Sequence, residues 1–218
     1  MIVSHEHKFI FAKTRKTAGT SLEVFLEPLC GAQDVVTPVS PAYQDSETAA
    51  HKPRNHQGFR NHAPADMIRS LVGESVWNSY YKFSVERNPW DKMVSMYWWR
   101  KFQYKIEDDF ASFCRKAVQS PNNVYTCPSD FHFYTIDSQL CVDKVIQFES
   151  LLDDFSSVCE HLGLGAVDAL PRAKGKIRKE KRHYSEYYDD ESRELIARRF
   201  RNEIELFGYE FSPDAARE

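Results

Sequence analysis

The chain has 218 residues, which suits one domain with a sizeable core, and its 42% hydrophobic and 28% charged residues are ordinary for a soluble globular protein. A net charge of −3 gives no general attraction to nucleic acid or to a membrane surface. No apolar stretch approaches the ~20 residues of a membrane-spanning helix. We therefore expect a soluble protein with a single domain over residues 1–218.

Cysteine usage and the N-terminal sequence bear on location. The five cysteines are irregularly spaced, odd in number and without a Cys-x-x-Cys pair, which favours reduced thiols over a disulfide framework or a zinc site. The residues after Met1 lack the pattern of a signal peptide. Together these features predict a cytoplasmic protein.

The first half of the chain alternates short apolar runs with helical patterns. We expect a buried strand at 8–12, a helix at 20–29 closed by Pro28 and Gly31, a long loop at 32–61, and a helix from Pro64 to the stop at Gly73. A loop of that length in a compact domain is usually functional or mobile.

The second half continues the alternation. The expected elements are a strand at 80–85, a helix from about Trp90 to Arg100, helices at 107–119 and 151–162, a strand at 141–148, and a tail helix from Asp189 to Gly208. Strands that alternate with helices predict an α/β protein. We expect a P-loop-like three-layer fold with a central, mainly parallel sheet flanked by helices.

The segment after the first predicted strand is a candidate anion site. Lys13 to Ser21 reads Lys-Thr-Arg-Lys-Thr-Ala-Gly-Thr-Ser and leads into a helix. Backbone N–H groups at a helix N-terminus favour a phosphate-like anion, and Lys16, Thr17 and Thr20 add side-chain donors, as does Ser21. The segment is not a Walker A motif, because Lys16 precedes Gly19 by three residues.

A second motif follows the strand at 80–85. Arg87 leaves the strand end before Asn88-Pro89, and Ser95 lies eight residues further on in the next helix. An arginine and a serine so placed can hold one phosphate from two sides. Arg87 could instead pair with Glu86 or Asp91. Because both motifs occur in this order, we favour the phosphate site.

These two motifs resemble those of sulfotransferases that use 3′-phosphoadenosine 5′-phosphosulfate (PAPS). Lys16-Thr17-Ala18-Gly19-Thr20-Ser21 is similar to their 5′-phosphosulfate loop, and Arg87 through Ser95-Met96-Tyr97 to their 3′-phosphate motif. The resemblance extends from about residue 8 to 211 and is greatest to the carbohydrate branch, including heparan sulfate 2-O-sulfotransferases and bacterial enzymes. Two departures are Arg15, where many relatives carry proline, and Glu86, where a neutral residue is common.

The resemblance implies in-line transfer of a sulfuryl group from PAPS to a hydroxyl of an acceptor, without a metal ion. Negative charge builds on the leaving phosphate, and Lys16 is the candidate cation that stabilises it. The resemblance assigns the cradle of that phosphate to Thr17, Ala18, Gly19, Thr20 and Ser21. Arg87 and Ser95 would bind the 3′-phosphate. The acceptor would be a glycan or a small molecule.

A general base must take the proton of the acceptor hydroxyl, and histidine has the right unperturbed pKa. His62 lies just before the helix at Pro64, in the interval where relatives carry a catalytic histidine, so we assign it this role. It could instead be a helix cap or a core residue. His56 and His51 are alternatives, and we favour the base over a metal cluster of these three histidines.

A basic run extends from Arg172 to Arg182, with seven Lys or Arg residues and one acid, Glu180. Such a run is usually a solvated face. The resemblance suggests that it folds over the adenine and 3′-phosphate of the donor, with Arg178 and Arg182 as candidate contacts. It could equally bind an acidic acceptor. The alternatives to a sulfotransferase are a P-loop kinase and a nucleotide- or polyanion-binding module.

Overall fold

The computed structural model describes residues 1–39, 48–119, 124–125, 127–171, 173, 177–180 and 182–212. The chain divides into two compact units. The first comprises Met1–Glu86 and Asp130–Lys174, and the second comprises Arg87–Ser129 and Gly175–Glu218. That the chain forms a single domain over 1–218 remains a prediction.

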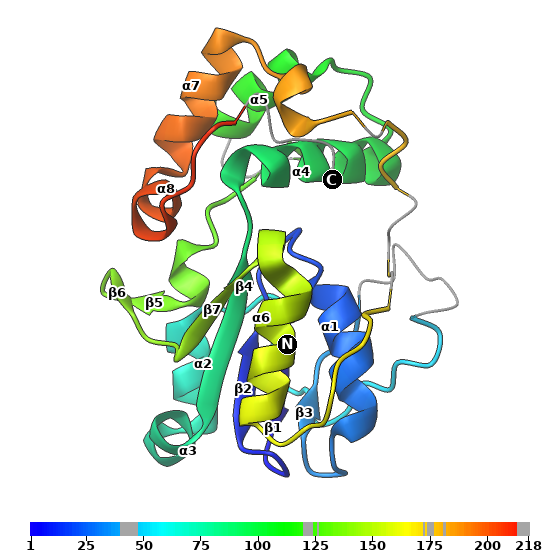
Figure 1. Ribbon diagram of the computed structural model, residues 1–218, viewed down its shortest axis with the longest axis vertical. Coiled ribbons are helices and arrows are strands. Elements are labelled where there is room, and N and C mark those ends of the chain that lie inside the picture. Colours follow the sequence, from blue (N-terminus) through cyan, green and yellow to red (C-terminus); the bar gives the residue numbers. More distant parts are fainter. Residues whose placement is uncertain are drawn as a thin grey trace. The chain divides into compact units, whose positions relative to one another are not determined.

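The first unit contains a five-stranded sheet in the order β3-β1-β2-β4-β7 (Figure 1). Its strands are β1 (Ile2–Ser4), β2 (Phe9–Ala12), β3 (Val35–Val36), β4 (Tyr81–Glu86) and β7 (Lys144–Gln147). β2, β4 and β7 pair in parallel, whereas β1 is antiparallel to both β2 and β3. Four strands therefore share one direction and β1 opposes them, which confirms the predicted mainly parallel sheet.

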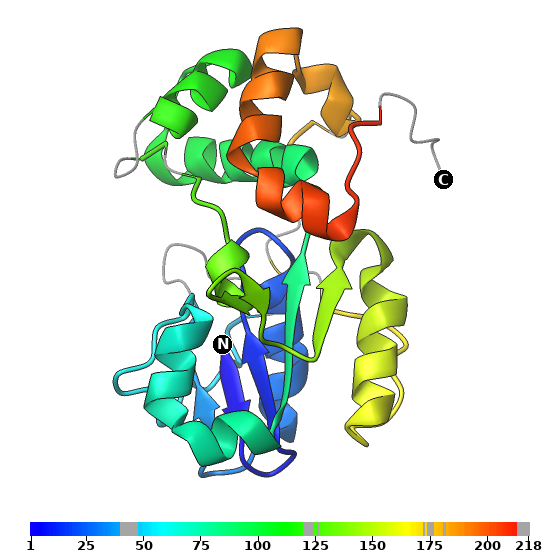
Figure 2. The ribbon, with the colours of Figure 1, turned by 90° about the vertical axis from the view of Figure 1, so that its left-hand side faces the viewer.

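Helices cover both faces of this sheet, as Figure 2 shows for α6 on one side and α2 and α3 on the other. The helices of the unit are α1 (Gly19–Leu26), α2 (Ala65–Val72), α3 (Glu74–Ser79) and α6 (Leu151–His161). Short 3-10 turns lie at η1 (Glu27–Leu29), η2 (Phe131–Phe133) and η3 (Phe148–Ser150), and a small hairpin at β5 (Thr135–Ile136) and β6 (Gln139–Leu140).

Strand β2 shows why the sheet has two apolar faces. Its residues alternate, so that Phe9 and Phe11 join the core under α1 and α6, while Ile10 and Ala12 join the core under α2 and α3. All four side chains are buried. A strand buried on both faces reads as a continuous apolar run in the sequence, and its side chains still alternate between the faces.

The second unit is helical and has its own core, built largely from aromatic side chains. Its elements are α4 (Pro89–Tyr104), α5 (Phe110–Gln119), η4 (Tyr184–Tyr187), α7 (Asp190–Arg199) and α8 (Arg201–Phe207). Asn88 caps α4, because its side chain accepts a hydrogen bond from the N–H of Trp90 at 3.1 Å, and Pro89 supplies the preset φ of the first helical residue.

The structure differs from the predicted elements in several places. α1 ends at Leu26 and continues as the 3-10 turn η1, because Pro28 lacks the N–H that a longer α-helix needs. The loop predicted at 32–61 contains β3, whose two residues are too few for a periodic pattern. Strand β1 and helix α3 were not predicted. The tail forms two helices that meet at the buried Phe200.

Candidate functional site

The loop after β2 has an unusual backbone. Lys16 and Ala18 have positive φ values of 63° and 58°, a region that costs a non-glycine residue on the order of 1–3 kcal/mol. The carbonyl of Ala18 accepts from the N–H groups of Ser21 at 2.8 Å and Leu22 at 3.2 Å. Among the described residues, no backbone carbonyl accepts from the N–H groups of Gly19 and Thr20. The loop therefore presents donors at the N-terminus of α1, which suits an anion.

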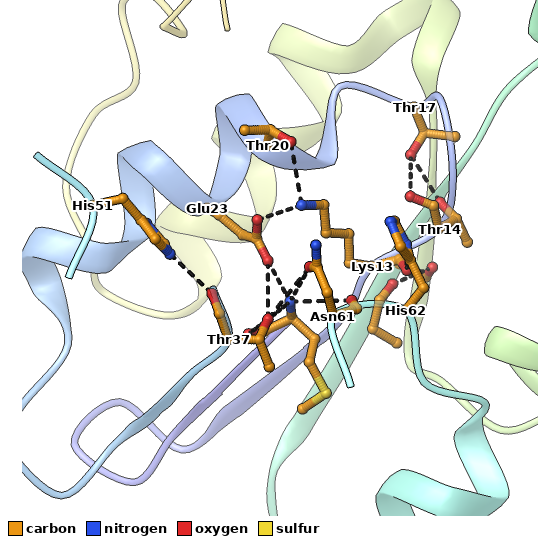
Figure 3. A network of polar contacts seen from close by, with 12 residues as sticks. Lys13, Thr14, Thr17, Thr20, Glu23, Thr37, His51, Asn61 and His62 are labelled. Carbon is orange, nitrogen blue, oxygen red and sulfur yellow. Dashed lines mark hydrogen bonds and ion pairs between the residues drawn. The ribbon is translucent and has the colours of Figure 1, made fainter. Parts of the chain in front are cut away.

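Lys13 lies beneath this loop and was not among the predicted site residues (Figure 3). Its side chain is almost wholly buried, and its ammonium contacts the carboxylate of Glu23 and, at 3.2 Å, the hydroxyl of Thr20. A Cβ on Gly19 would lie 2.7 Å from Cγ of Lys13, so the glycine makes room for the lysine stem. The sequence signal was a lysine directly after an apolar strand and six residues before a glycine.

Glu23 is the buried counterion on α1. Burial opposes its ionisation, but the charges of Lys13 and of the Met1 amino group outweigh burial and lower the pKa of Glu23 to about 2. The ammonium of Lys13 and the Met1 amino group, whose own pKa burial lowers to about 5, both contact its carboxylate. The side chain of Glu23 thus fixes the position of α1 relative to the end of β2.

Asp130 holds Arg15 of the same loop. One carboxylate oxygen accepts from the main-chain N–H of Arg15 at 2.7 Å, and the other contacts its guanidinium. The guanidinium carbon also lies 4.9 Å from the ring centre of Phe133. Arg15, noted above as a departure from the proline of many relatives, is therefore paired with a fully buried carboxylate.

Two threonines tie the loop to the sheet. The hydroxyl of Thr14 contacts the carbonyl of Val85 in β4 and lies 2.8 Å from the hydroxyl of Thr17. Thr17 is fully buried, so its hydroxyl is directed into the loop and not away from it. Ser21 is also buried, with only 6% of its surface exposed.

His62 lies at the base of the loop. Nδ1 of His62 is 3.0 Å from the carbonyl of Lys13. A carbonyl only accepts, so Nδ1 carries the proton and Nε2 is left with a free lone pair. Burial and the charge of Lys13 lower the pKa of His62 to about 4. The neutral imidazole is therefore the form present at neutral pH, and it is the form a general base requires.

The alternative histidines are less well placed. Nε2 of His51 lies 2.9 Å from the carbonyl of Thr37, so it is Nε2 that carries the proton in His51. Its other nitrogen, Nδ1, is buried and has no partner among the described residues. His56 contributes its carbonyl to a turn with Phe59. Of the three histidines, His62 is the one that contacts the 13–18 loop.

In the second unit, two arginines converge on Asp91. Nε of Arg87 donates to Oδ2 of Asp91 at 2.9 Å, and an N–H of Arg178 lies 3.3 Å from Oδ1. An Arg87–Asp91 pair was the alternative to a phosphate site that the sequence left open. In the structure this pair forms, and Arg178 contacts the same carboxylate. Ser95 lies on the same helix, one turn after Asp91 and thus on the same side of α4.

Arg182 belongs to the same cluster of side chains. Its guanidinium carbon lies 3.9 Å from the ring centre of Tyr187, and that of Arg178 lies 5.5 Å from it. The carbonyl of Arg182 accepts from Arg178 at 2.6 Å. Of the run from Arg172 to Arg182, residues 172, 174–176 and 181 lie outside the described residues.

The predicted site residues thus form two groups. In the first unit, the structure brings His62 to the carbonyl of Lys13, at the start of the loop that leads into residues 16–21. In the second, it brings together Arg87, Arg178 and Arg182 beside the α4 face that carries Ser95. Among the described residues, no group of three or more His, Cys, Asp or Glu side chains is arranged to hold a metal ion.

The chain belongs to the sulfotransferase family, whose model matches residues 1–210. It is therefore a transferase of sulfuryl groups, with the α/β fold of that family. The chain is also 35% identical over 104 residues to an uncharacterized protein of Archaeoglobus fulgidus, a match that covers 46% of this chain and 82% of that protein. No solved structure matches the chain significantly. The family match does not favour the alternatives of a P-loop kinase or a nucleotide-binding module.

None of the described helices combines the length and apolar character that crossing a lipid bilayer requires.

Proposed function

We propose that the protein transfers a sulfuryl group from PAPS to a hydroxyl of a carbohydrate acceptor. The observation that supports the proposal is the hydrogen bond from Nδ1 of His62 to the carbonyl of Lys13, at the start of the loop that bears Lys16. A sulfuryl transferase needs a cation for the leaving phosphate and a base for the attacking hydroxyl. The loop supplies the candidate cation, Lys16, and His62 beside its first residue is the candidate base.

Bound PAPS would supply an activated sulfuryl group attached to its 5′-phosphate. The N–H groups of Gly19 and Thr20 and the dipole of α1 would bind that phosphate. Lys16 would stabilise the negative charge that develops on it as the bond to sulfur breaks. Nε2 of His62 would accept the proton of the acceptor hydroxyl. These residue types fit a phosphosulfate anion.

In this proposal, the group around Asp91 would bind the 3′-phosphate. Arg87 and Arg178 offer charge-assisted hydrogen bonds, and Asp91 holds the two guanidinium groups in place before the ligand arrives. Ser95 adds a hydroxyl donor from the same helix. Arg182, against the ring of Tyr187, would contact the nucleotide beside them. The carbohydrate acceptor and the cytoplasmic location are inferred from the sequence resemblance and composition.

Titration calorimetry tests the donor. We expect adenosine 3′,5′-bisphosphate to bind the protein without Mg²⁺, and Arg87→Ala to weaken this binding by a few kcal/mol at most, because one charge-assisted hydrogen-bonding group is lost. Mg²⁺-dependent binding of ATP without binding of the bisphosphate would favour a kinase. Binding of a polyanion alone would favour a binding module.

Transfer from radiolabelled PAPS to a panel of sugars, glycans and simple alcohols tests the acceptor. Labelling of glycans in preference to the simple alcohols supports the proposal. Labelling of the alcohols alone would overturn the carbohydrate assignment but leave the donor assignment standing.

A further inference from the structure

The strained loop that carries Lys16 is held by contacts outside the residues assigned above. Positive φ values at Lys16 and Ala18 persist only where surrounding contacts determine the backbone. After Ala18, the first turn of α1 supplies such contacts through the N–H groups of Ser21 and Leu22. Before Lys16, the hydroxyl of Thr14 contacts the carbonyl of Val85 in β4, and Asp130 accepts the main-chain N–H of Arg15 at 2.7 Å.

Asp130 is suited to this task because it binds both the backbone and the side chain of one residue. Its second carboxylate oxygen contacts the guanidinium of Arg15, so the backbone and the side chain of Arg15 are both fixed. The carboxylate is fully buried, whereas the side chain of Arg15 is 27% exposed. A charge-assisted hydrogen bond in a buried setting is stronger than a neutral one.

The turn that begins at Asp130 also contacts His62. Phe133, at the end of η2, places its ring 4.9 Å from the guanidinium carbon of Arg15. The ring of His62 meets the same phenylalanine edge-on, with 6.5 Å between ring centres. One short turn therefore lies against Arg15, which precedes Lys16, and against His62.

We propose that Asp130 and Phe133 form a support that positions Lys16 and His62 together, with Asp130 acting through Arg15. Asp130 is a positioning residue, since its carboxylate holds the backbone and the side chain of Arg15. The expected effect of Asp130 on turnover rests on the proposed function. Its expected effect on the order of the loop does not depend on that function.

Variants that neutralise Asp130 and Arg15 singly and together distinguish a positioning role of Asp130 from a direct role of the Arg15 charge in the reaction. Asp130→Asn keeps the size of the side chain and removes its charge, and Arg15→Gln removes the cation. In the double variant Arg15→Gln/Asp130→Asn, two amides can hydrogen-bond to each other. If position matters, the double variant recovers much of the turnover that either single variant loses. If the charge of Arg15 itself serves the reaction, it does not.

The matched control is Glu74→Gln. Glu74 pairs with Arg69 at 3.0 Å in the same unit, but both side chains are exposed. An exposed pair of this kind contributes little to stability or to local order. We expect this variant to behave like the wild type in every measurement below.

Two measurements test the proposal. In hydrogen exchange without any ligand, Asp130→Asn should speed exchange of the amides of residues 15–17, whereas Glu74→Gln should not. In steady-state assays, Asp130→Asn should lower kcat about 100-fold, as expected for a displacement of about 1 Å in a catalytic group, with a smaller change in KM for the donor. Arg15→Gln serves as the test if Asp130→Asn fails to fold.

Unchanged exchange at residues 15–17 in both single variants would overturn the inference. A double variant no better than Arg15→Gln alone would also overturn it, because the arginine charge would then be the required feature. A wild-type protein without sulfuryl transfer would overturn the proposed function, while the exchange measurement would still decide the role of Asp130.

Discussion

At the scale of single residues, the candidate chemistry depends on which atoms are left available by the local contacts. The hydrogen bond from Nδ1 of His62 to Lys13 leaves Nε2 as the basic atom, and burial beside Lys13 keeps the ring neutral. Asp91 aligns Arg87 by a direct contact. The sequence indicated these residue types and their order, but the contact that selects one nitrogen of a histidine is a tertiary one.

Lys16→Ala tests the role of the loop lysine. We expect kcat to fall on the order of 100- to 1000-fold, because the contact of Lys16 strengthens as charge develops on the leaving phosphate. Affinity for adenosine 3′,5′-bisphosphate, measured by calorimetry, should change far less. Equal losses in turnover and affinity would make Lys16 a binding residue only.

His62→Ala should abolish transfer and leave nucleotide binding intact, as measured by a transfer assay and by calorimetry. In the wild type, the pH profile should show its acid limb near pH 4 and not near 6.5, because burial and Lys13 lower the pKa of His62 and the charged form cannot accept a proton. The charges that act on this ring include Lys13, Asp130 and Arg15. An acid limb near pH 6.5, or transfer retained in the variant, would point to another base.

At the scale of elements, the loop geometry depends on how α1 is fastened to β2. Lys13, at the end of β2, and Glu23, on α1, form a buried pair, and Gly19 leaves room for the lysine stem. The strand, the loop and the helix could be predicted from the sequence, because apolar runs and helical spacing are local signals. The Lys13–Glu23 contact could not, since either residue alone reads as an ordinary surface charge.

Glu23→Gln tests this fastening. We expect the variant to lose about 3–5 kcal/mol of unfolding free energy, because Lys13 would remain buried without its counterion. Urea denaturation measures the loss, with the exposed Glu74→Gln as the control. The folded pKa of Glu23 is depressed to about 2, so its stabilisation should be present above the ordinary value of 4.5 and decline as pH falls toward 2. A loss no larger than that of the control would contradict this role.

At the scale of the whole molecule, the chain contributes alternate stretches of sequence to the two units. The chain passes from the first unit to the second after Glu86, returns at Asp130, and leaves again after Lys174. Strand β7 and helix α6 of the first unit therefore follow α4 and α5 of the second in sequence. Neither unit consists of one continuous stretch of chain, and local sequence patterns contain no signal for this arrangement.

The interleaving leads to a prediction about unfolding. Because each unit needs two separate stretches of chain, we expect one cooperative thermal transition, as our expectation of a single domain over 1–218 requires. Differential scanning calorimetry should give equal calorimetric and van't Hoff enthalpies. Two resolved transitions would show that the units fold independently and would contradict that expectation.

The sequence by itself determined the class of fold and the order of the two motifs, because alternating apolar patterns and the spacing of loop residues are local properties of the chain. It also determined the family, which the match over residues 1–210 bears out. The tertiary structure decided the pairing of Arg15 with Asp130, of Lys13 with Glu23 and of His62 with a carbonyl of the loop. These partners are separated by 10 to 115 positions, so only folding brings them within hydrogen-bonding distance.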